Sequence, residues 1–144
     1  MTIFVRPARA EDKEQIAEWF VKTKHFEPEL PKFPSTYTLC AFTKGKIVGF
    51  LVVQIEYEYQ AVLRFIPNPE ASELEKASAS FELIKQAIFV GYSGGLTKIY
   101  FEGSDTGTNR IASHRFKQIS ANESQNIFEN TNYPVYLLEL KDLE

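Results

Sequence analysis

The chain has 144 residues, 44% of them hydrophobic, so we predict one globular domain over residues 1–144 that buries about two-thirds of the surface exposed by its unfolded form. Its net charge of −3 provides no general field for nucleic acid or an anionic membrane, and we expect neither as a partner. A single cysteine, Cys40, excludes a disulfide or a cysteine-based metal cluster within these residues. There is no run of about 18 apolar residues and no basic N-terminal segment leading into an apolar one, so we expect a cytoplasmic protein.

The N-terminal part of the sequence predicts a strand, a helix and an irregular loop. Residues 3–6 are rich in β-forming side chains, and they predict the strand. The acidic residues Glu11 and Asp12 suit the positive end of a helix that runs to about residue 23, with its apolar residues on one face. Residues 26–34 contain three prolines, which remove backbone donors and therefore predict a partly exposed loop.

The central part predicts three antiparallel strands and a long helix. Residues 37–42 and 47–56 are β-rich runs joined by a short turn that contains glycine, and a third strand at residues 61–66 is stopped by prolines. From Ser72 onward, apolar residues recur at three- and four-residue steps. This spacing predicts a helix of about five turns that ends near Gly91.

The C-terminal part predicts a strand, a helix and a closing strand. Residues 97–101 form the first of these, and the turn-rich residues 103–107 lead to a helix that begins at about residue 108 and ends near Ser120. After a polar stretch, residues 133–140 predict the last strand. The full order of elements predicts an α/β (α+β) domain whose mixed, mostly antiparallel, twisted sheet is flanked by helices.

Three patterns, in this order, resemble the GNAT superfamily of acyl-CoA-dependent N-acetyltransferases over nearly the whole chain. They are Arg6, Pro7, Ala8 and Asp12; residues 42–50 with their Val-Gly-Phe step; and Ser104, Asp105, Asn109, Ala112 and Phe116. The resemblance implies the GNAT fold and transfer of an acyl group from acetyl-CoA, or a related acyl-CoA, to an amine of a small molecule or peptide. The long helix between residues 64–66 and 98–100 predicts that these segments are neighbouring, roughly parallel strands that splay apart at one end.

The cofactor loop of that superfamily is altered in this sequence. Its members hold the pyrophosphate of CoA with backbone N–H groups of a Gln/Arg-x-x-Gly-x-Gly/Ala loop. The best alignment puts Glu75, Ser78 and Ser80 at the key positions, with Leu83 behind them. Glu75 sets a negative charge beside an anionic ligand, whereas Ser78 and Ser80 are small and offer hydroxyl donors. We therefore expect acetyl-CoA to bind weakly or not at all.

If acetyl-CoA is the donor, two neighbouring strands are expected to supply the groups that bind its thioester carbonyl and deprotonate the amine. Backbone N–H groups of Leu63, Arg64 and Phe65 would hold the carbonyl oxygen. Glu56 or Glu58 would assist deprotonation of the amine, since a general base needs a carboxylate within hydrogen-bond reach of the proton. The alternative for both glutamates is a solvated strand face.

The resemblance assigns further residues to the cofactor and the acceptor. In the superfamily's last helix an asparagine is followed, seven residues later, by a tyrosine that protonates the leaving thiolate. The matching residues are Asn109 and Phe116, both assigned to the cofactor site, but Phe116 has no proton to give and a water must serve instead. Phe26 and Phe33 either line an acceptor pocket or plug the end of the sheet, and Asp105 is expected to cap the last helix.

A metal centre is not expected, and a non-catalytic function remains the alternative. His25 and His114 lack accompanying carboxylates or thiols, and Cys40 is interpreted as a small core residue. Some tailed-phage virion proteins also resemble this fold while lacking the cofactor loop, and residues 113–117 resemble their last helix. The rival function is therefore a catalytically inactive GNAT-fold interaction or structural protein. The oligomeric state stays open, a homodimer included.

Overall fold

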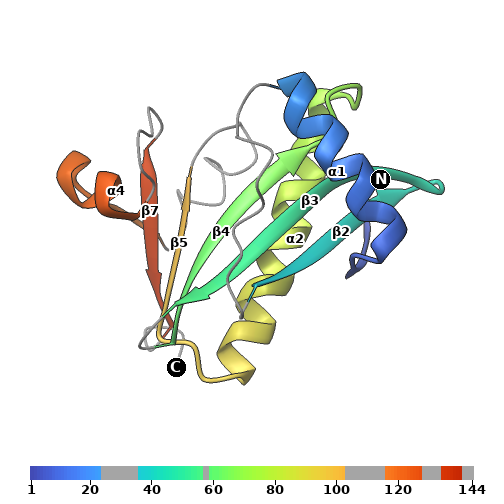
Figure 1. The fold of residues 1–144 in the computed structure, drawn as a ribbon. Coiled ribbons are helices and arrows are strands. Elements are labelled where there is room, and N and C mark those ends of the chain that lie inside the picture. The colour runs from blue at the N-terminus through green and yellow to red at the C-terminus, as the bar shows by residue number, and fades with distance from the viewer. Residues whose placement is uncertain (24–35, 57–58, 103–115, 128–133, 141–144) are drawn as a thin grey trace.

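The computed structural model of the protein describes residues 1–23, 36–56, 59–102, 116–127 and 134–140. Its helices and strands follow the chain in the order shown in Figure 1. They are β1 (Phe4–Pro7), α1 (Ala10–Thr23), β2 (Thr36–Thr43), β3 (Lys46–Glu56), β4 (Gln60–Pro67), α2 (Glu73–Ser93), β5 (Lys98–Glu102), β6 (Lys117–Gln118), α4 (Ala121–Ile127) and β7 (Val135–Glu139).

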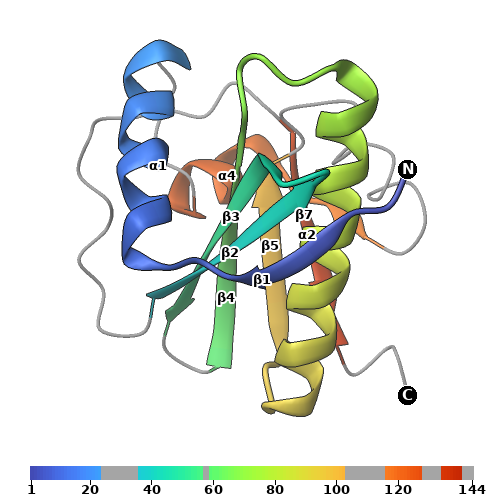
Figure 2. The same ribbon diagram turned by 90° about the vertical axis from the view of Figure 1, so that its right-hand side faces the viewer.

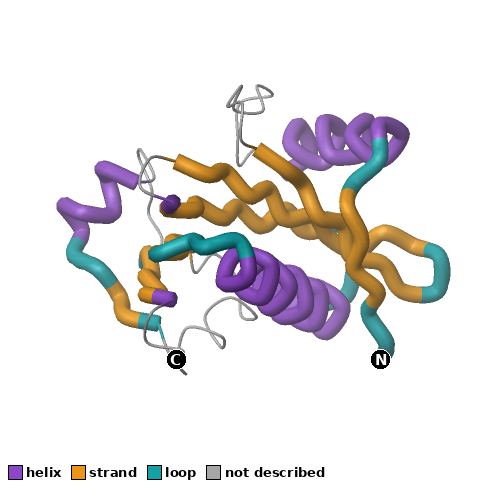
Figure 3. The backbone as a smooth tube through the Cα atoms, turned by 90° about the horizontal axis from the view of Figure 1, so that it is seen from below, coloured by secondary structure: helices purple, strands orange, loops and turns teal. Residues whose placement is uncertain are grey.

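The described strands form one seven-stranded sheet in the order β1-β2-β3-β4-β5-β7-β6. Each pair of neighbours is antiparallel except β4 and β5, which run parallel and are connected through α2. The helices α1 and α2 cover opposite faces of the sheet, as the views in Figure 2 and Figure 3 show. The predicted architecture, a mixed and mostly antiparallel sheet flanked by helices, is confirmed.

The β2–β3 hairpin turns through the Thr-Lys-Gly-Lys segment that predicted it. Lys44 and Gly45 both have positive φ angles, 53° and 75°. Two consecutive residues with positive φ are the mark of a tight hairpin turn whose twist matches that of the flanking strands, and glycine adopts this conformation without steric cost. The turn sets Phe42 opposite Ile47, and a β-bulge between Ala41 and Phe42 then shifts the register so that Leu39 lies opposite Leu51.

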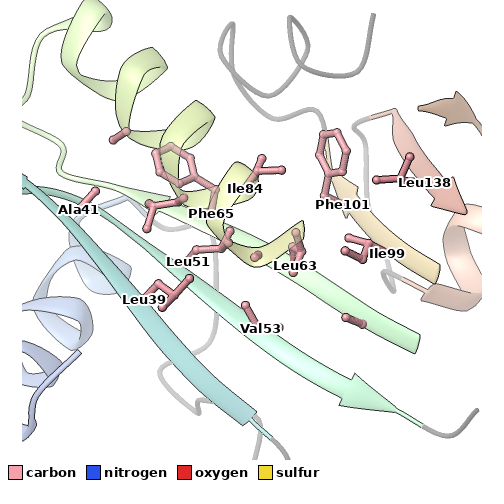
Figure 4. Close-up of a cluster of buried hydrophobic side chains, with 14 of the residues drawn as sticks. Leu39, Ala41, Leu51, Val53, Leu63, Phe65, Ile84, Ile99, Phe101 and Leu138 are labelled. Atoms are coloured by element: carbon pink, nitrogen blue, oxygen red, sulfur yellow. The ribbon is translucent and has the colours of Figure 1, made fainter. Parts of the chain in front are cut away.

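The main hydrophobic core lies between the sheet and α2, and Figure 4 shows the side chains that fill it. Leu51, Leu63 and Phe65 rise from the central strands toward the helix. A Cβ atom added at Gly49 would lie 2.8 Å from Cε1 of Phe65. The glycine of the Val-Gly-Phe step therefore leaves room for the Phe65 ring, which also lies near Ala79 of α2.

A second buried cluster lies under α1 on the other face of the sheet. Trp19 of α1 packs on Phe50 with a ring-centroid distance of 4.9 Å, and the thiol of Cys40 is fully buried beside them. Burial raises the pKa of the Cys40 thiol. The cysteine is thus a core residue, as its position in an apolar strand predicted.

The junction between β1 and α1 is held by a charged pair. The guanidinium of Arg6 donates to Oδ2 of Asp12 over 2.6 Å, and the backbone N–H of Arg9 donates to the same oxygen over 2.8 Å. Asp12 is buried, whereas the Arg6 side chain is 27% exposed and lies over the ring of Phe42. The hydrogen bond from Arg6 holds the pKa of Asp12 below its usual value of 3.8. The opening Arg-Pro-Ala pattern with Asp12 therefore joins the first strand to the first helix.

The prediction of a helix that ends near Ser120 is wrong for the residues just before Ser120. Lys117–Gln118 forms β6, which pairs with β7, and Ile119 packs in a small cluster beside the sheet. A helix, α4, begins directly after Ser120, whose Oγ accepts the N–H of Glu123 over 3.2 Å. Ser120 is therefore a helix start rather than a helix end, and the Ser-x-x-Glu sequence is the signal that indicates it. The predicted beginning of the earlier helix lies outside the described residues.

Candidate functional site

The parallel strands β4 and β5 part after a short paired stretch. Their register runs from Gln60 opposite Lys98 to Leu63 opposite Phe101, yet β4 continues to Pro67. Figure 1 shows the two strands diverging beyond this point. Among the described residues no strand pairs with this edge of β4 after Leu63, so backbone donors and acceptors there can face a ligand. The predicted parallel pair and its splay are confirmed, but the predicted register is wrong. Lys98–Tyr100 lie opposite Gln60–Val62 rather than residues 64–66, and residues 64–67 form the open arm.

The two faces of the sheet present different side chains at this opening. Leu63 and Phe101 belong to the core on the α2 side. Because side chains alternate along a strand, the next residues, Arg64 and Glu102, lie on the α1 side, one on each arm. Both are partly exposed. The sequence pattern drew attention to Arg64 but missed Glu102, because only the parallel pairing of β4 with β5 shows that Glu102 follows the last paired residue.

An aromatic group closes the α2 side of the opening. Phe116 packs edge-on against Phe101, with ring centroids 4.5 Å apart, and Tyr136 of β7 stacks on the same ring at 5.5 Å. Phe116 thus lies beside the point where the strands part, and its assignment to the cofactor site stays a prediction. Tyr136, which the sequence did not single out, brings a phenol side chain into this group.

The turn between β4 and α2 uses its backbone N–H groups internally. Asn68 N–H donates to the carbonyl of Val48 over 3.0 Å, and the Asn68 side chain accepts from Glu70 N–H over 2.9 Å. Ala71 N–H donates to the Asn68 carbonyl over 3.1 Å, and residue 69 is a proline with no N–H to give. This turn is therefore self-satisfied and lacks the bare backbone that a pyrophosphate needs.

The start of α2 is capped by its own side chains. Ser72 Oγ accepts from Glu75 N–H over 3.1 Å, and Glu75 Oε1 accepts from Ser72 N–H over 2.9 Å, which together make a capping box. The hydrogen bond from the Ser72 backbone lowers the pKa of Glu75. A bound phosphate would have to compete with this carboxylate for N–H groups, and the neighbouring Glu73 is paired with Lys76 over 3.4 Å.

The alignment of residues 75–80 with a cofactor loop is wrong, because these residues are helical. Ser78 and Ser80 lie in the second turn of α2, where their N–H groups belong to the helix. Ser80 is fully buried, and its hydroxyl donates to the carbonyl of Ala77 over 2.9 Å. The capping box starts the helix before the residues that the alignment placed in the loop.

The predicted general bases are not brought to the opening by the part of the chain that the structure describes. Glu56 is the last residue of β3 and lies opposite Gln60, at the paired end of β4 and β5. At about 3.3 Å per residue, its backbone is roughly 10 Å along the sheet from the level of Leu63. Glu58, Asn109, Phe26 and Phe33 lie outside the described residues, and their assignments stay predictions.

The described residues offer neither a metal-binding cluster nor a membrane-spanning helix. They contain no group of three or more His, Cys, Asp and Glu side chains that could hold a metal ion. None of their helices is both long and apolar enough to cross a lipid bilayer.

The structure is similar to solved N-acetyltransferases along nearly its whole length. An acetyltransferase of the GNAT family from Staphylococcus aureus Mu50 superposes with a TM-score of 0.67 at 13% identity, over 96% of this chain and 99% of that one. A ribosomal-protein-alanine N-acetyltransferase from Escherichia coli gives 0.63 at 14% identity, over 96% and 94% of the two chains. PaiA N-acetyltransferase from Thermoplasma acidophilum, solved with coenzyme A, gives 0.63 at 16% identity, over 96% and 99%.

These likenesses lie in the structure rather than in the sequence. No protein-family model matches the sequence, and no curated protein matches it. At 13–16% identity, what is shared is the fold over nearly the whole chain. The chain therefore has the fold of the GNAT N-acetyltransferases.

Proposed function

We propose that this protein is a cytoplasmic N-acyltransferase that takes an acyl group from acetyl-CoA, or a related thioester, and transfers it to an amine of a small molecule or peptide. The observation that carries the proposal is the parting of β4 and β5 beyond Leu63 and Phe101. An open strand edge of this kind offers backbone N–H and C=O groups to the amides of a pantetheine arm, which binds as an added strand. The same edge places N–H donors near the thioester carbonyl.

Glu102 is the general base that this geometry favours. The amine nitrogen attacks the carbonyl carbon, the C–S bond breaks, and the sulfur leaves as a thiolate. A carboxylate on the β5 arm is placed to accept the proton that the nitrogen loses, while Arg64 on the β4 arm adds positive charge near the developing oxyanion. Phe116 lacks a hydroxyl, so the thiolate takes its proton from water.

The donor is held by its pantetheine arm rather than by its pyrophosphate. Asn68, Ser72 and Glu75 occupy three of the N–H groups at this helix start, those of Glu70, Glu75 and Ser72. S-acetyl-pantetheine, which lacks the nucleotide and its phosphates, should therefore bind with nearly the same affinity as acetyl-CoA, within about threefold.

Calorimetric titration with both donors tests where the donor binds, and an amine screen with thiol detection tests the chemistry. Glu102→Gln should lower acyl transfer by about 10² or more, as expected for loss of a general base, without changing donor affinity. Glu56→Gln is the matched control and should leave the rate unchanged. A much tighter complex with acetyl-CoA than with acetyl-pantetheine, or equal rates for both variants, would overturn these assignments.

A second candidate function is favoured by the self-satisfied β4–α2 turn. A GNAT-fold protein without catalysis, acting as an interaction or structural module, does not need free backbone N–H groups to bind a pyrophosphate. A ligand at a hundred times its dissociation constant stabilises the folded state by about 2.7 kcal/mol. If neither acetyl-CoA, CoA nor acetyl-pantetheine raises the melting temperature, the transferase proposal is refuted and this alternative stands.

A further inference from the structure

The face of α2 that points away from the sheet carries large apolar side chains among polar ones. Buried residues such as Leu83 and Ala87 face the core. The opposite side carries large apolar side chains with high exposed fractions: Leu74 65%, Phe81 46%, Phe89 68% and Tyr92 46%. We call these four residues the outer stripe. In Figure 3 the outer side of α2 faces away from the sheet.

The members of the outer stripe lie on one helix face, with the exposed Lys85 between Phe81 and Phe89. The members are separated by seven, eight and three residues, spacings that keep side chains on one helix face. From Leu74 to Tyr92 the stripe spans about 27 Å at 1.5 Å per residue. With about 200 Å² for a fully exposed aromatic side chain, its exposed area is about 400 Å², the size of patch that often has a binding function on a soluble protein.

Charged residues near the middle of the stripe make it complementary to itself. Lys85 lies between Phe81 and Phe89, with its Nζ 5.9 Å from the centre of the Phe81 ring and 3.8 Å from Oε2 of Glu82. A two-fold axis beside residue 83 that sets two copies of α2 antiparallel brings Lys85 of each copy to Phe81 and Glu82 of the other. The contacts that Lys85 makes within its own helix can thus be repeated across the axis, as a self-complementary interface requires.

The same axis also determines which side chains of the two copies of α2 face each other away from the centre. It places Phe89 of one copy opposite the small Ser78 of the other, and Leu74 beside Tyr92. Tyr92 also lines a surface pocket of about 550 Å³ at the C-terminal end of the helix, with Leu96 and Leu140. Packing of Phe89 on Ser78, contact of Leu74 with Tyr92 and opposite charges at the centre fit one register of the two helices and disfavour a slip by a turn.

We infer that the outer stripe of α2 is the interface of a symmetric homodimer, in which a second copy of this chain packs antiparallel against it. Two copies would bury about 800 Å² of apolar surface from the stripe alone, an area in the range of weak, transient association. We therefore expect a weak, reversible dimer with a dissociation constant on the order of micromolar or above. This inference does not depend on the proposed function, because the stripe lies on the far side of α2 from the sheet.

Sedimentation velocity of the full chain between about 5 and 500 µM tests the interface. We expect a reversible monomer–dimer equilibrium that Phe89→Lys weakens by more than about 30-fold, because the substituted residue occurs twice in the interface. Phe4→Ser is the matched control, since Phe4 is an equally large exposed aromatic on β1 that stacks on Phe42, and it should leave association unchanged. Circular dichroism confirms that each variant is folded.

A charge exchange tests the register of the two helices. Lys85→Glu should weaken association, because it sets two pairs of like charges across the axis, and adding Glu82→Lys should restore it. A monomer at every concentration would overturn the inference and leave the stripe to a different partner. A dimer that survives Phe89→Lys, or a double variant no better than Lys85→Glu alone, would also overturn it.

Discussion

Replacing Asp12 by Asn should destabilise the domain far more than its position at the start of a surface helix suggests. One carboxylate oxygen, Oδ2, accepts from both Arg6 and the backbone of Arg9, and Oδ1 accepts from Arg6 over 3.3 Å. An asparagine can keep one oxygen in place of Oδ2, but its NH₂ group then faces the guanidinium, a donor against a donor. The substitution therefore removes the charge and one hydrogen bond while the site stays buried.

The magnitude follows from the bonds that are lost or weakened. A hydrogen bond to a charged group contributes about 1.5–3 kcal/mol, and the Arg6 side chain can recover part of its hydration because it is partly exposed. We expect a loss of about 1–3 kcal/mol in the free energy of unfolding. For a domain of this size that corresponds to a fall in melting temperature of roughly 3–10 °C.

Thermal unfolding of Asp12→Asn and Glu11→Gln separates this contribution from a general effect of charge near the helix start. Glu11 lies in the same first turn, but its contact with Arg9 is 3.9 Å long between exposed groups, so its loss should cost no more than about 1 kcal/mol. Equal effects of the two substitutions would refute the argument, because they would show that the buried Arg6–Asp12 pair adds nothing beyond helix electrostatics.

The pH dependence of the same pair has a definite sign. The pKa of Asp12 is lower in the folded state than its usual 3.8, so the charged form is the one that the fold stabilises. Its contribution is fully present above the unfolded-state pKa and is lost as the pH falls through the folded-state pKa. The gap in stability between the native protein and Asp12→Asn should therefore be constant from about pH 5 to 8 and close progressively below about pH 4.

Three further outcomes test the packing. Gly49→Ala should cost about 1–3 kcal/mol in urea unfolding, because the new Cβ meets the Phe65 ring, and Phe65→Leu should recover part of that loss in the double variant. Cys40 should react with an aromatic disulfide reagent only on unfolding, because the thiol is fully buried and its pKa is raised. Ser120→Ala should lower stability by about 0.5–1 kcal/mol through loss of the α4 cap, measured by the same urea titration, whereas no effect would argue against a structured helix at residues 121–127.

Much of the fold could be predicted because local signals and the sheet agree. The glycine turn at residues 44–45, the apolar stripe of α2 and the prolines that end β4 each set the limits of an element without reference to the rest of the chain. The parallel pairing of β4 with β5 followed from the long helix that connects them. These features depend on short-range sequence, which a single chain displays directly.

The site was harder to predict because its residues meet through long-range pairing. Glu102 lies at the opening only because β5 aligns with β4 in one register, and no local pattern records that register. The alignment of residues 75–80 failed for a different reason. It took a leucine as its reference point, whereas the Ser72 and Glu75 capping signal, which is local and strong, places those residues inside a helix.

The cap of α2 and a CoA pyrophosphate compete for the same backbone donors, and this competition gives the last prediction. Glu75→Ala frees the N–H of Ser72 and removes a negative charge, so it should tighten binding of acetyl-CoA by about three- to tenfold while leaving acetyl-pantetheine unchanged. It should also lower the melting temperature of the unliganded protein, since half of the capping box is lost.

Glu73→Ala is the matched control, because it removes an exposed charge from the same helix turn without opening the cap. If that variant gained as much affinity as Glu75→Ala, the effect would be one of net charge rather than of freed donors. A gain shared equally by acetyl-pantetheine would show instead that the change acts through the strand edge. Only a gain confined to the nucleotide-bearing donor and to Glu75→Ala agrees with a helix start that is closed by its own carboxylate.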